Sequence, residues 1–429
     1  MTMPRLSPIG ERRRNLLAAA GRMLIVCVLL LSGLLFTLGM SSTKGHVLLF
    51  DFKGGLYNAG TAIVHGHDPY QPGFLAKQAA IMRAGGIARG ETDQNAFSIP
   101  VYPAPINLLM VPFSLLPFWL AGALFTLILI AAMAIGLRLL GVRDWRCIAV
   151  ALASWPCVYA LDLGAIGPLL VLGIGAAWRW RDRVWPPAMA IASIVVAKVF
   201  PWPMAVWLLI TKRWRAFALA CAIGAVVTFA AWAVIGFDGM TQYPKMLSEL
   251  SRIQEGRAVS LVAVLLALGV PASLASGLSL VATGGLLLVA WRVARQGTAG
   301  HAPAFGLAVI AALTSTPIVW EHYMVLLFVP IALISPRLSA LWFLPCATPL
   351  IRALTQAIAP MPAAAAGTSH ATIRAAVLWL VLEAIVAWRL CRFGAEASPS
   401  RERLAARLRR RSAAVAAPGR PAGRLARPV

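Results

Sequence analysis

The sequence predicts an all-α protein, a polytopic bundle of transmembrane helices with about twelve crossings. Of its 429 residues, 60% are hydrophobic and only 13% are charged, and the cations fall in short clusters between apolar runs. A soluble core cannot bury that much apolar surface, whereas lipid can solvate it. The formal net charge of +24 therefore indicates the positive-inside pattern of membrane proteins rather than a surface that binds nucleic acid.

The N-terminal part of the chain predicts one crossing followed by a long outer loop. The basic stretch 1–22 is expected to be cytoplasmic, and the apolar run 23–40 is expected to be the first helix. An extracytoplasmic loop over 41–117 follows and is too polar between 51 and 98 to face lipid. Its last part, PINLLMVPFSLLP, is broken by prolines, so it predicts interfacial helices. The second crossing is expected over 118–140.

Two hairpins with short apolar arms are expected next. The first pairs 148–161 with 167–178, and the second pairs 185–197 with 203–210, each flanked by basic residues. Every arm is shorter than the roughly 20 residues of a full crossing. The turns DLGAIG and KVFPWP are therefore expected within the membrane, beside a water-filled cavity, and Lys198 would lie there at a protected depth.

The remaining chain predicts further crossings and a basic tail. A crossing over 216–235 leads to an outer loop, and the apolar stretch that ends near 268 is expected to be interfacial. Later crossings are expected at 275–292, 303–317, 323–335, 338–354 and 373–391. The transmembrane domain thus covers 23–391, both termini are cytoplasmic, and the Arg-rich tail 392–429 is expected to be disordered.

Most of the unusual polar residues lie on the predicted outer face. They are Asp51, Lys53, Tyr57, His65, His67, Asp68, Tyr70, Tyr102, Asp162, Lys198, Glu321 and His322. A site there that opens to the bilayer suits a substrate that is itself partly lipid. Transfer of a sugar from a lipid phosphate needs a carboxylate to accept the proton of the attacking hydroxyl and cations to hold the departing phosphate.

Several of these residues admit two interpretations. Asp51 is the candidate base, and a solvated loop carboxylate is the alternative. Lys198 is either a functional intramembrane cation or a lysine that extends to the interface. His322 is either a neutral interface residue or a proton carrier, and Glu321 beside it either joins the site or sets the helix start. His65, His67 and Asp68 lack further spaced ligands, so no metal site is predicted.

Five motifs follow one another in a characteristic order. They are D-x5-Y-x-A from Asp51 to Ala59, GHDPY at 66–70, VYPAPINLLMVPFSLLP, AKVFPWP and STPIVWEHYMVLL. Over most of residues 40–335 this order resembles glycosyltransferase family 87 of the GT-C superfamily. The resemblance implies a GT-C fold and an inverting, metal-independent hexosyltransferase without a cofactor. Its donor would be a polyprenyl-phosphate sugar, typically mannose, and its acceptor a lipid or glycan on the outer side of the plasma membrane.

The resemblance also implies roles for single residues. Asp51 would be the general base and His322 a second catalytic residue, with Lys198 near the donor phosphate. The other expected substrate-binding residues are Tyr57, Asp68, Tyr70, Tyr102 and Glu321, of which Tyr70 and Tyr102 would shape the sugar or acceptor cleft. The chain has Gly164-Ala165 where the family usually has Gly-Gln in the first hairpin turn.

Two other functions compete with glycosyl transfer. The first is a transporter or lipid flippase with a site around Lys198, although the sequence has no related halves. The second is a non-catalytic membrane scaffold whose outer loop binds a partner. Only the transferase hypothesis requires Asp51 and Lys198 to face one cavity that lipid-linked substrates reach.

Overall fold

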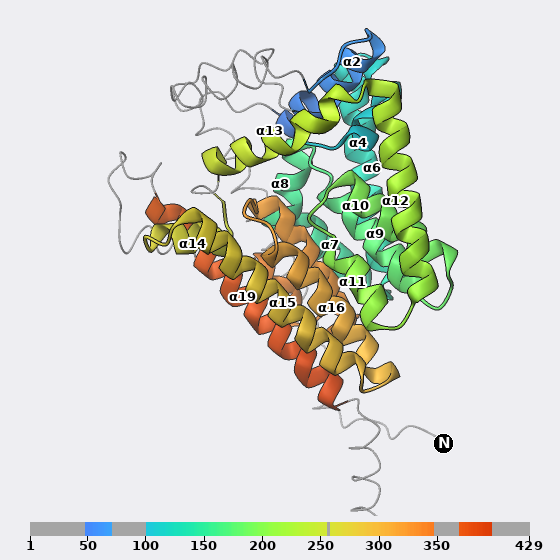
Figure 1. Cartoon of the computed structure of the whole chain (residues 1–429). Helices are drawn as coiled ribbons and strands as arrows, with labels where there is room; N and C mark the ends of the chain where they lie inside the picture. Colours follow the sequence, from blue (N-terminus) through green and yellow to red (C-terminus); the bar gives the residue numbers. More distant parts are fainter. Residues whose placement is uncertain (1–47, 71–99, 255–257, 347–368, 397–429) are drawn as a thin grey trace, which may run out of the picture.

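The protein is an all-α membrane bundle, as the sequence predicted. The computed structural model describes residues 48–70, 100–254, 258–346 and 369–396, and these residues contain helices and no β-strand (Figure 1). The predicted first crossing at 23–40 lies outside the described residues. So do 71–99 of the outer loop, 347–354 of a predicted crossing and the tail from 397 onward.

Three described helices are long and apolar enough to cross a membrane: α6 (Phe118–Leu139), α12 (Trp214–Ile235) and α15 (Ala272–Ala294). Large apolar side chains on α12 and α15, such as Phe229 and Val281, are exposed, as lipid-facing residues are. A fourth crossing results when α7 (Trp145–Ala153) and α8 (Trp155–Leu163) are counted as one bent span. The higher number of about twelve crossings stays a prediction.

The arm predicted at 148–161 is two helices rather than one, because α7 and α8 meet at 60°. Ser154 lies between them in extended conformation, and its hydroxyl accepts a hydrogen bond from the backbone N–H of Cys157. A serine N-cap followed by proline at the second helical position starts a new helix. This bend directs the end of α8 toward the cavity described below.

The other hairpin arms are confirmed almost to the residue. They are α9 (Gly167–Arg179), α10 (Trp185–Ala197) and α11 (Pro203–Ile210), each with proline in its first turn. Helix α9 packs so closely on α6 that a Cβ atom at Gly175 would lie only 2.5 Å from the carbonyl oxygen of Gly136. Glycines at such crossings let two helix backbones approach.

The shorter elements surround this framework. In the outer region they are η1 (Phe52–Tyr57), α2 (Asn58–Val64), α4 (Ala104–Leu109), α5 (Val111–Ser114), α13 (Asp238–Gln254) and α14 (Leu261–Ala267). Helices α4 and α5 are too short to cross, as expected for the proline-broken segment, whereas α13 occupies a region predicted as loop. The C-terminal part contains α16 (Thr298–Thr314), η3 (Glu321–Leu327), α17 (Phe328–Ile334) and η4 (Ala340–Phe343), together with one long helix, α19 (Ser369–Glu396), of 28 residues.

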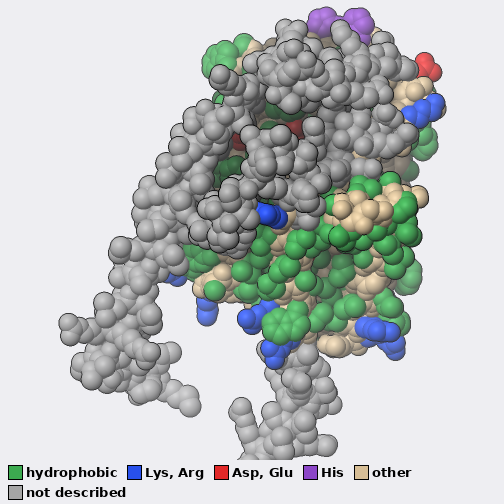
Figure 2. Space-filling model, turned by 90° about the vertical axis from the view of Figure 1, so that its left-hand side faces the viewer, with side chains coloured by type: hydrophobic (Ala, Val, Ile, Leu, Met, Phe, Trp, Pro, Cys, Tyr) green, Lys and Arg blue, Asp and Glu red, His purple; other side chains and the backbone are tan. Residues whose placement is uncertain are grey.

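In the view of Figure 2, Lys and Arg side chains gather at one end of the molecule, below a hydrophobic band, and histidine side chains are visible at the other end. Helix α9 ends at the basic side with Arg179, and α10 starts there and runs back to Lys198. Exposed tryptophans mark the same end, among them Trp145 and Trp214 at helix starts. Tryptophans beside cations are typical of a membrane–water interface.

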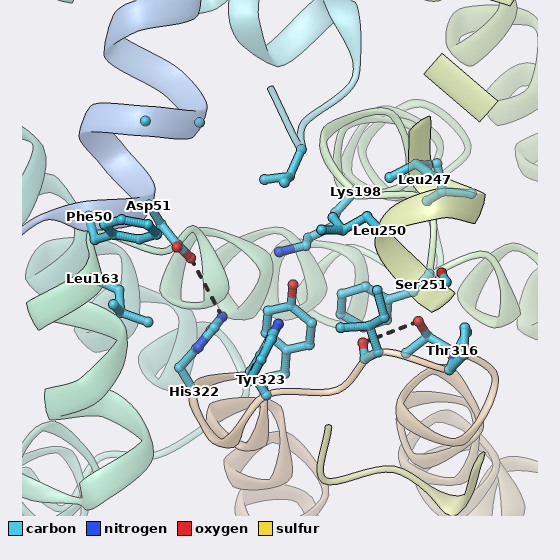
Figure 3. A pocket seen from close by; sticks show the side chains of 18 of the residues that line it. Phe50, Asp51, Leu163, Lys198, Leu247, Leu250, Ser251, Thr316, His322 and Tyr323 are labelled. Carbon is cyan, nitrogen blue, oxygen red and sulfur yellow. Dashed lines mark hydrogen bonds and ion pairs between the residues drawn. The ribbon is translucent and has the colours of Figure 1, made fainter. Parts of the chain in front are cut away.

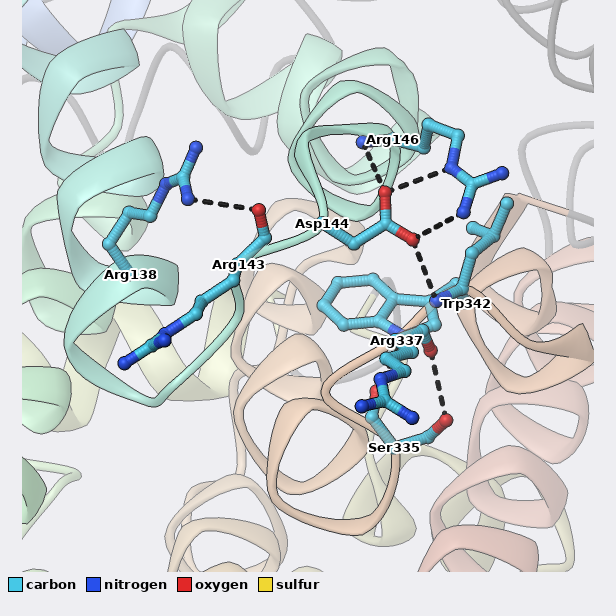
Figure 4. A network of polar contacts seen from close by, with 8 residues as sticks. Arg138, Arg143, Asp144, Arg146, Ser335, Arg337 and Trp342 are labelled. Atoms are coloured by element: carbon cyan, nitrogen blue, oxygen red, sulfur yellow. Dashed lines mark hydrogen bonds and ion pairs between the residues drawn. The ribbon is translucent and has the colours of Figure 1, made fainter. Parts of the chain in front are cut away.

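Asp144 links two segments of the chain at the basic end of the bundle. Its carboxylate accepts hydrogen bonds from the backbone and side chain of Arg146, at 2.8–3.1 Å, and from the backbone N–H of Leu338 at 3.3 Å (Figure 4). It therefore caps α7 and holds the segment that leads to η4. These bonds, that of the Arg146 side chain foremost, lower the pKa of Asp144.

Candidate active site

A cavity of about 620 Å³ lies where α10 ends at Lys198, away from the basic loops, and Figure 3 shows its lining side chains. It is bounded by η1, the end of α8, the α10–α11 turn, one face of α13 and the segment that enters η3. Apolar and aromatic side chains form most of its wall. Of the polar groups in the wall, three are ionisable residues that the sequence singled out: Asp51, Lys198 and His322. The volume suits a small-molecule substrate site.

Asp51 is positioned by η1, a π-helical turn that it precedes as the N-cap. Its side chain makes no capping bond, is 23% exposed, and points into the cavity (Figure 3). Gly54 and Gly55, one turn later, also line the cavity, and a Cβ atom at Gly55 would lie 3.1 Å from the Tyr102 ring. Burial raises the pKa of Asp51 to about 6, although the positive charge of Lys198 acts to lower it.

Lys198 is positioned by the end of α10. It is the C-cap in extended conformation, and Pro201 and Pro203 follow, so the helix cannot continue. Its ammonium nitrogen lies 4.0 Å from the ring centre of Tyr323 and 4.9 Å from that of Tyr102. Burial lowers the pKa of Lys198 to about 8, while the Asp51 charge acts in the opposite direction.

His322 lies in the first turn of η3 and is only 2% exposed. Its Nε2 atom is 4.0 Å from a carboxylate oxygen of Asp51, too far for a hydrogen bond. Within the described residues, neither ring nitrogen has a hydrogen-bond partner. Burial and, to a smaller extent, the Lys198 charge lower the pKa of His322, which is therefore neutral at pH 7 and offers one donor and one acceptor.

The three residues come from segments more than 100 residues apart in sequence, yet they face one another. Among the described residues, Lys198 makes no ion pair within 4.0 Å, and the imidazole that lies 4.0 Å from the Asp51 carboxylate is neutral at pH 7. Buried polar groups are almost always satisfied, so a buried imidazole with two nitrogens unpartnered in the described part of the chain, facing an aspartate and a lysine across one cavity, indicates a site built for a ligand.

The predicted tyrosines lie behind this wall. The hydroxyl of Tyr57 donates to the carbonyl of Leu116 at 2.8 Å. That of Tyr70 donates to the carbonyl of Tyr102 at 2.7 Å and accepts from the amide of Asn107 at 2.8 Å. Neither residue lines the cavity, while Tyr102 contacts Lys198 through its ring.

Asp68 and Glu321 also lie outside the cavity wall. Asp68 accepts a hydrogen bond from the backbone N–H of Tyr70 at 2.8 Å, which shapes the local turn. Glu321 accepts from the indole N–H of Trp155 and so ties η3 to α8. The roles of these two carboxylates and of the tyrosines in substrate binding stay predictions.

The sequence reasoning missed part of the wall. Tyr243, Leu247 and Leu250 of α13 line the cavity at helical spacing, as do Tyr159 and Tyr323 from α8 and η3. The apolar spacing of i, i+4 and i+7 in α13 is a readable signal for an amphipathic helix. Tyr323 directly follows the predicted His322, but the sequence does not indicate whether a tyrosine at a helix start packs in the core or lines a cavity.

The histidines of the outer region do not join the site. His65 and His67 are exposed, and the Nδ1 atom of His65 lies at hydrogen-bonding distance, 2.7 Å, from the carbonyl of Thr61. Across the described ranges, no group of three or more His, Cys, Asp or Glu residues is arranged to hold a metal ion. Metal independence stays a prediction.

Comparison with known proteins points to one family. The model of glycosyltransferase family 87 matches residues 101–319, half of the chain. A mannosyltransferase of Mycolicibacterium smegmatis, the polyprenol-phosphate-mannose-dependent alpha-(1-2)-phosphatidylinositol pentamannoside mannosyltransferase, is 26% identical over 167 residues. That alignment covers 37% of this chain and 40% of the relative. No solved structure matches the chain.

Proposed function

Since the chain belongs to glycosyltransferase family 87 and is a membrane glycosyltransferase, we propose that it moves a hexose from a polyprenyl-phosphate donor to a lipid or glycan acceptor. Mannose is the first candidate, because the mycolicibacterial relative depends on polyprenol-phosphate-mannose. The observation that carries the proposal is the convergence of Asp51, Lys198 and His322 on one cavity, where neither ring nitrogen of His322 has a hydrogen-bond partner among the described residues.

In the proposed reaction, Asp51 accepts the proton of the acceptor hydroxyl as its oxygen attacks the anomeric carbon. The bond from that carbon to the donor phosphate breaks, and polyprenyl phosphate leaves as an anion with the electron pair. A single displacement of this kind inverts the anomeric centre. A carboxylate with a pKa of about 6 is a stronger base than an ordinary aspartate and is still mostly ionised at pH 7.

Lys198 would stabilise the negative charge that develops on the leaving phosphate. Preorganised cations in a cavity that excludes water are effective for this purpose, since they need no reorganisation as charge develops. His322, neutral and next to Asp51, would donate a hydrogen bond to the phosphate or to the substrate hydroxyl. The apolar face of α13 suits the first isoprenoid units of the donor.

The proposal also assigns a side of the membrane. Helix α10 starts at the basic end and runs to Lys198 in the cavity wall, so the cavity lies away from the Lys and Arg clusters that Figure 2 shows, and such clusters stay in the cytoplasm. The reaction would therefore take place on the extracytoplasmic face of the plasma membrane, where a lipid-linked donor enters from the bilayer.

The test is transfer by the purified protein in proteoliposomes. The protein is incubated with polyprenyl-phosphate donors labelled in mannose or glucose and with a lipid extract as acceptor, and the labelled product is identified by mass spectrometry. We expect a glycosylated lipid or glycan and release of polyprenyl phosphate. Translocation of the labelled donor across the bilayer without any glycosyl transfer would instead support the flippase hypothesis.

A further inference from the structure

Tyr323 is one of two tyrosine rings that contact the Lys198 ammonium. The Lys198 ammonium lies 4.0 Å from its ring centre, and the ring of Phe200 stacks on it at 5.3 Å with an interplanar angle of 14°. The His322 ring meets it edge-on at 4.4 Å. Lys198 and Phe200, two positions apart in the proline-rich turn, thus both contact one tyrosine ring of η3.

Tyr102 gives the same ammonium a second aromatic surface, at 4.9 Å. Its ring is fully buried, and its backbone carbonyl accepts the hydrogen bond from Tyr70. Gly55 packs against the ring, because a Cβ atom there would lie 3.1 Å from it. These contacts hold the Tyr102 ring in place, so the Lys198 amine contacts two aromatic surfaces from distant parts of the chain.

Aromatic faces are suited to a lysine whose charge must remain available. A ring face attracts a cation through its quadrupole, and the attraction grows when water is excluded. A neighbouring carboxylate would stabilise the cation more, but it would also neutralise it and compete with an anionic ligand. Among the described residues, no carboxylate lies within ion-pairing distance of Lys198.

We propose that Tyr323 and Tyr102 are positioning residues that hold the Lys198 ammonium between their ring faces, keep it charged and direct it at the donor phosphate. The assignment to a phosphate rests on the proposed function, while the aromatic support of the charge does not. In this arrangement the ring faces, rather than the hydroxyl groups, carry the effect. The other ionisable groups of the cavity wall are Asp51 and His322, together with Tyr159 on α8 and Tyr243 on α13.

The proposal predicts how the amine titrates. A ring face favours the protonated form, so its removal lowers the pH at which half of the Lys198 amine is free. Cation–π energies of partly desolvated pairs correspond to a shift of about 0.5–1.5 pH units. Tyr323→Leu should show this shift, whereas Tyr323→Phe keeps the ring and should show none. Tyr102→Leu should show a smaller shift in the same direction, since its ring is farther away.

The experiment is pH-dependent labelling of the full-length protein in detergent with acetic anhydride, read peptide by peptide by mass spectrometry. Lys212, exposed at the basic end, is the internal control whose labelling curve should be the same in all variants. A lower midpoint for Lys198 in Tyr323→Leu, with Tyr323→Phe unchanged, supports the proposal. An unchanged midpoint in Tyr323→Leu overturns it, and so does an equal shift in Tyr323→Phe.

A second variant keeps the test decisive, and its readout is independent of glycosyl transfer. If Tyr323→Leu is not monodisperse on size-exclusion chromatography, Tyr102→Leu takes its place. A lower Lys198 midpoint in Tyr102→Leu then supports the proposal, and an unchanged midpoint overturns it. The labelling requires no turnover, so it is independent of whether the wild type transfers sugar. Failure of transfer with an intact shift would refute the proposed function alone, and transfer without a shift would refute only the role of the tyrosines.

Discussion

Replacing Lys198 by arginine should keep the charge of the cavity wall at alkaline pH, where lysine loses it. With a pKa of about 8, Lys198 is charged in roughly nine-tenths of molecules at pH 7 and in about one-tenth at pH 9. If that charge stabilises the leaving phosphate, the kcat/KM of the wild type should fall about tenfold between these two values. At acid pH, kcat/KM should also decrease once the pH drops below the Asp51 pKa of about 6, because the base is then protonated.

The assay is glycosyl transfer in proteoliposomes at low donor concentration from pH 5 to pH 9.5, with each variant normalised to its own maximum. Arginine remains charged throughout this range, so the alkaline decrease should be absent from Lys198→Arg while the acid limb remains. The absolute rate is expected to be lower, because a guanidinium differs in shape from an ammonium. An alkaline decrease at the same pH in both proteins would refute the assigned role of Lys198.

Three other predictions concern the cavity wall and the framework. Leu250→Asp puts a charge on the cavity face of α13 and should raise the KM for the donor about tenfold. Its control, Ser248→Asp on the exposed face of the same helix, should leave the KM unchanged. Equal effects of the two substitutions would exclude a lipid-binding role for the cavity face of α13. Gly175→Ala should destabilise the fold by about 1–3 kcal/mol through overpacking, while Gly285→Ala, in open space, should be neutral or stabilising, as measured by thermal unfolding in detergent. Asp144→Ala should lower stability at pH 7 by about 1–2 kcal/mol. Because the folded-state pKa of Asp144 is lowered, this difference should vanish as the pH falls through that value, and a constant difference would argue against the carboxylate as its source.

The hairpin arms could be predicted from sequence because their signals are local. Arginine clusters, tryptophans and prolines mark both ends of α10 and α11, and the apolar runs between them have no other use in a membrane protein. The bend at Ser154 had a signal as well, a serine followed by Trp-Pro. It was overlooked because the apolar run continues through it. Helix α13 was overlooked because its polar composition dominated its apolar periodicity.

The residues of the site likewise divide into those that have a local sequence signal and those that have none. Asp51, Lys198 and His322 stand out in sequence because a charge or an imidazole next to an apolar run is costly and needs a reason. Aromatic residues carry no such signal. Tyr70 and Tyr323 are both nearly buried, yet the first supports Tyr102 from behind and the second faces the cavity. Only the tertiary fold decides which ring meets the lysine.

The account depends most on Asp51 as the base, and one substitution tests it directly. Asp51→Asn keeps the shape of the side chain and removes the proton acceptor, and Asp182→Asn, 77% exposed at the basic end, is the matched control. In proteoliposomes with labelled donor, the account predicts that Asp51→Asn lowers kcat by about 10²–10⁴-fold, while Asp182→Asn retains the wild-type rate. Transfer by folded Asp51→Asn protein at the wild-type rate would contradict it.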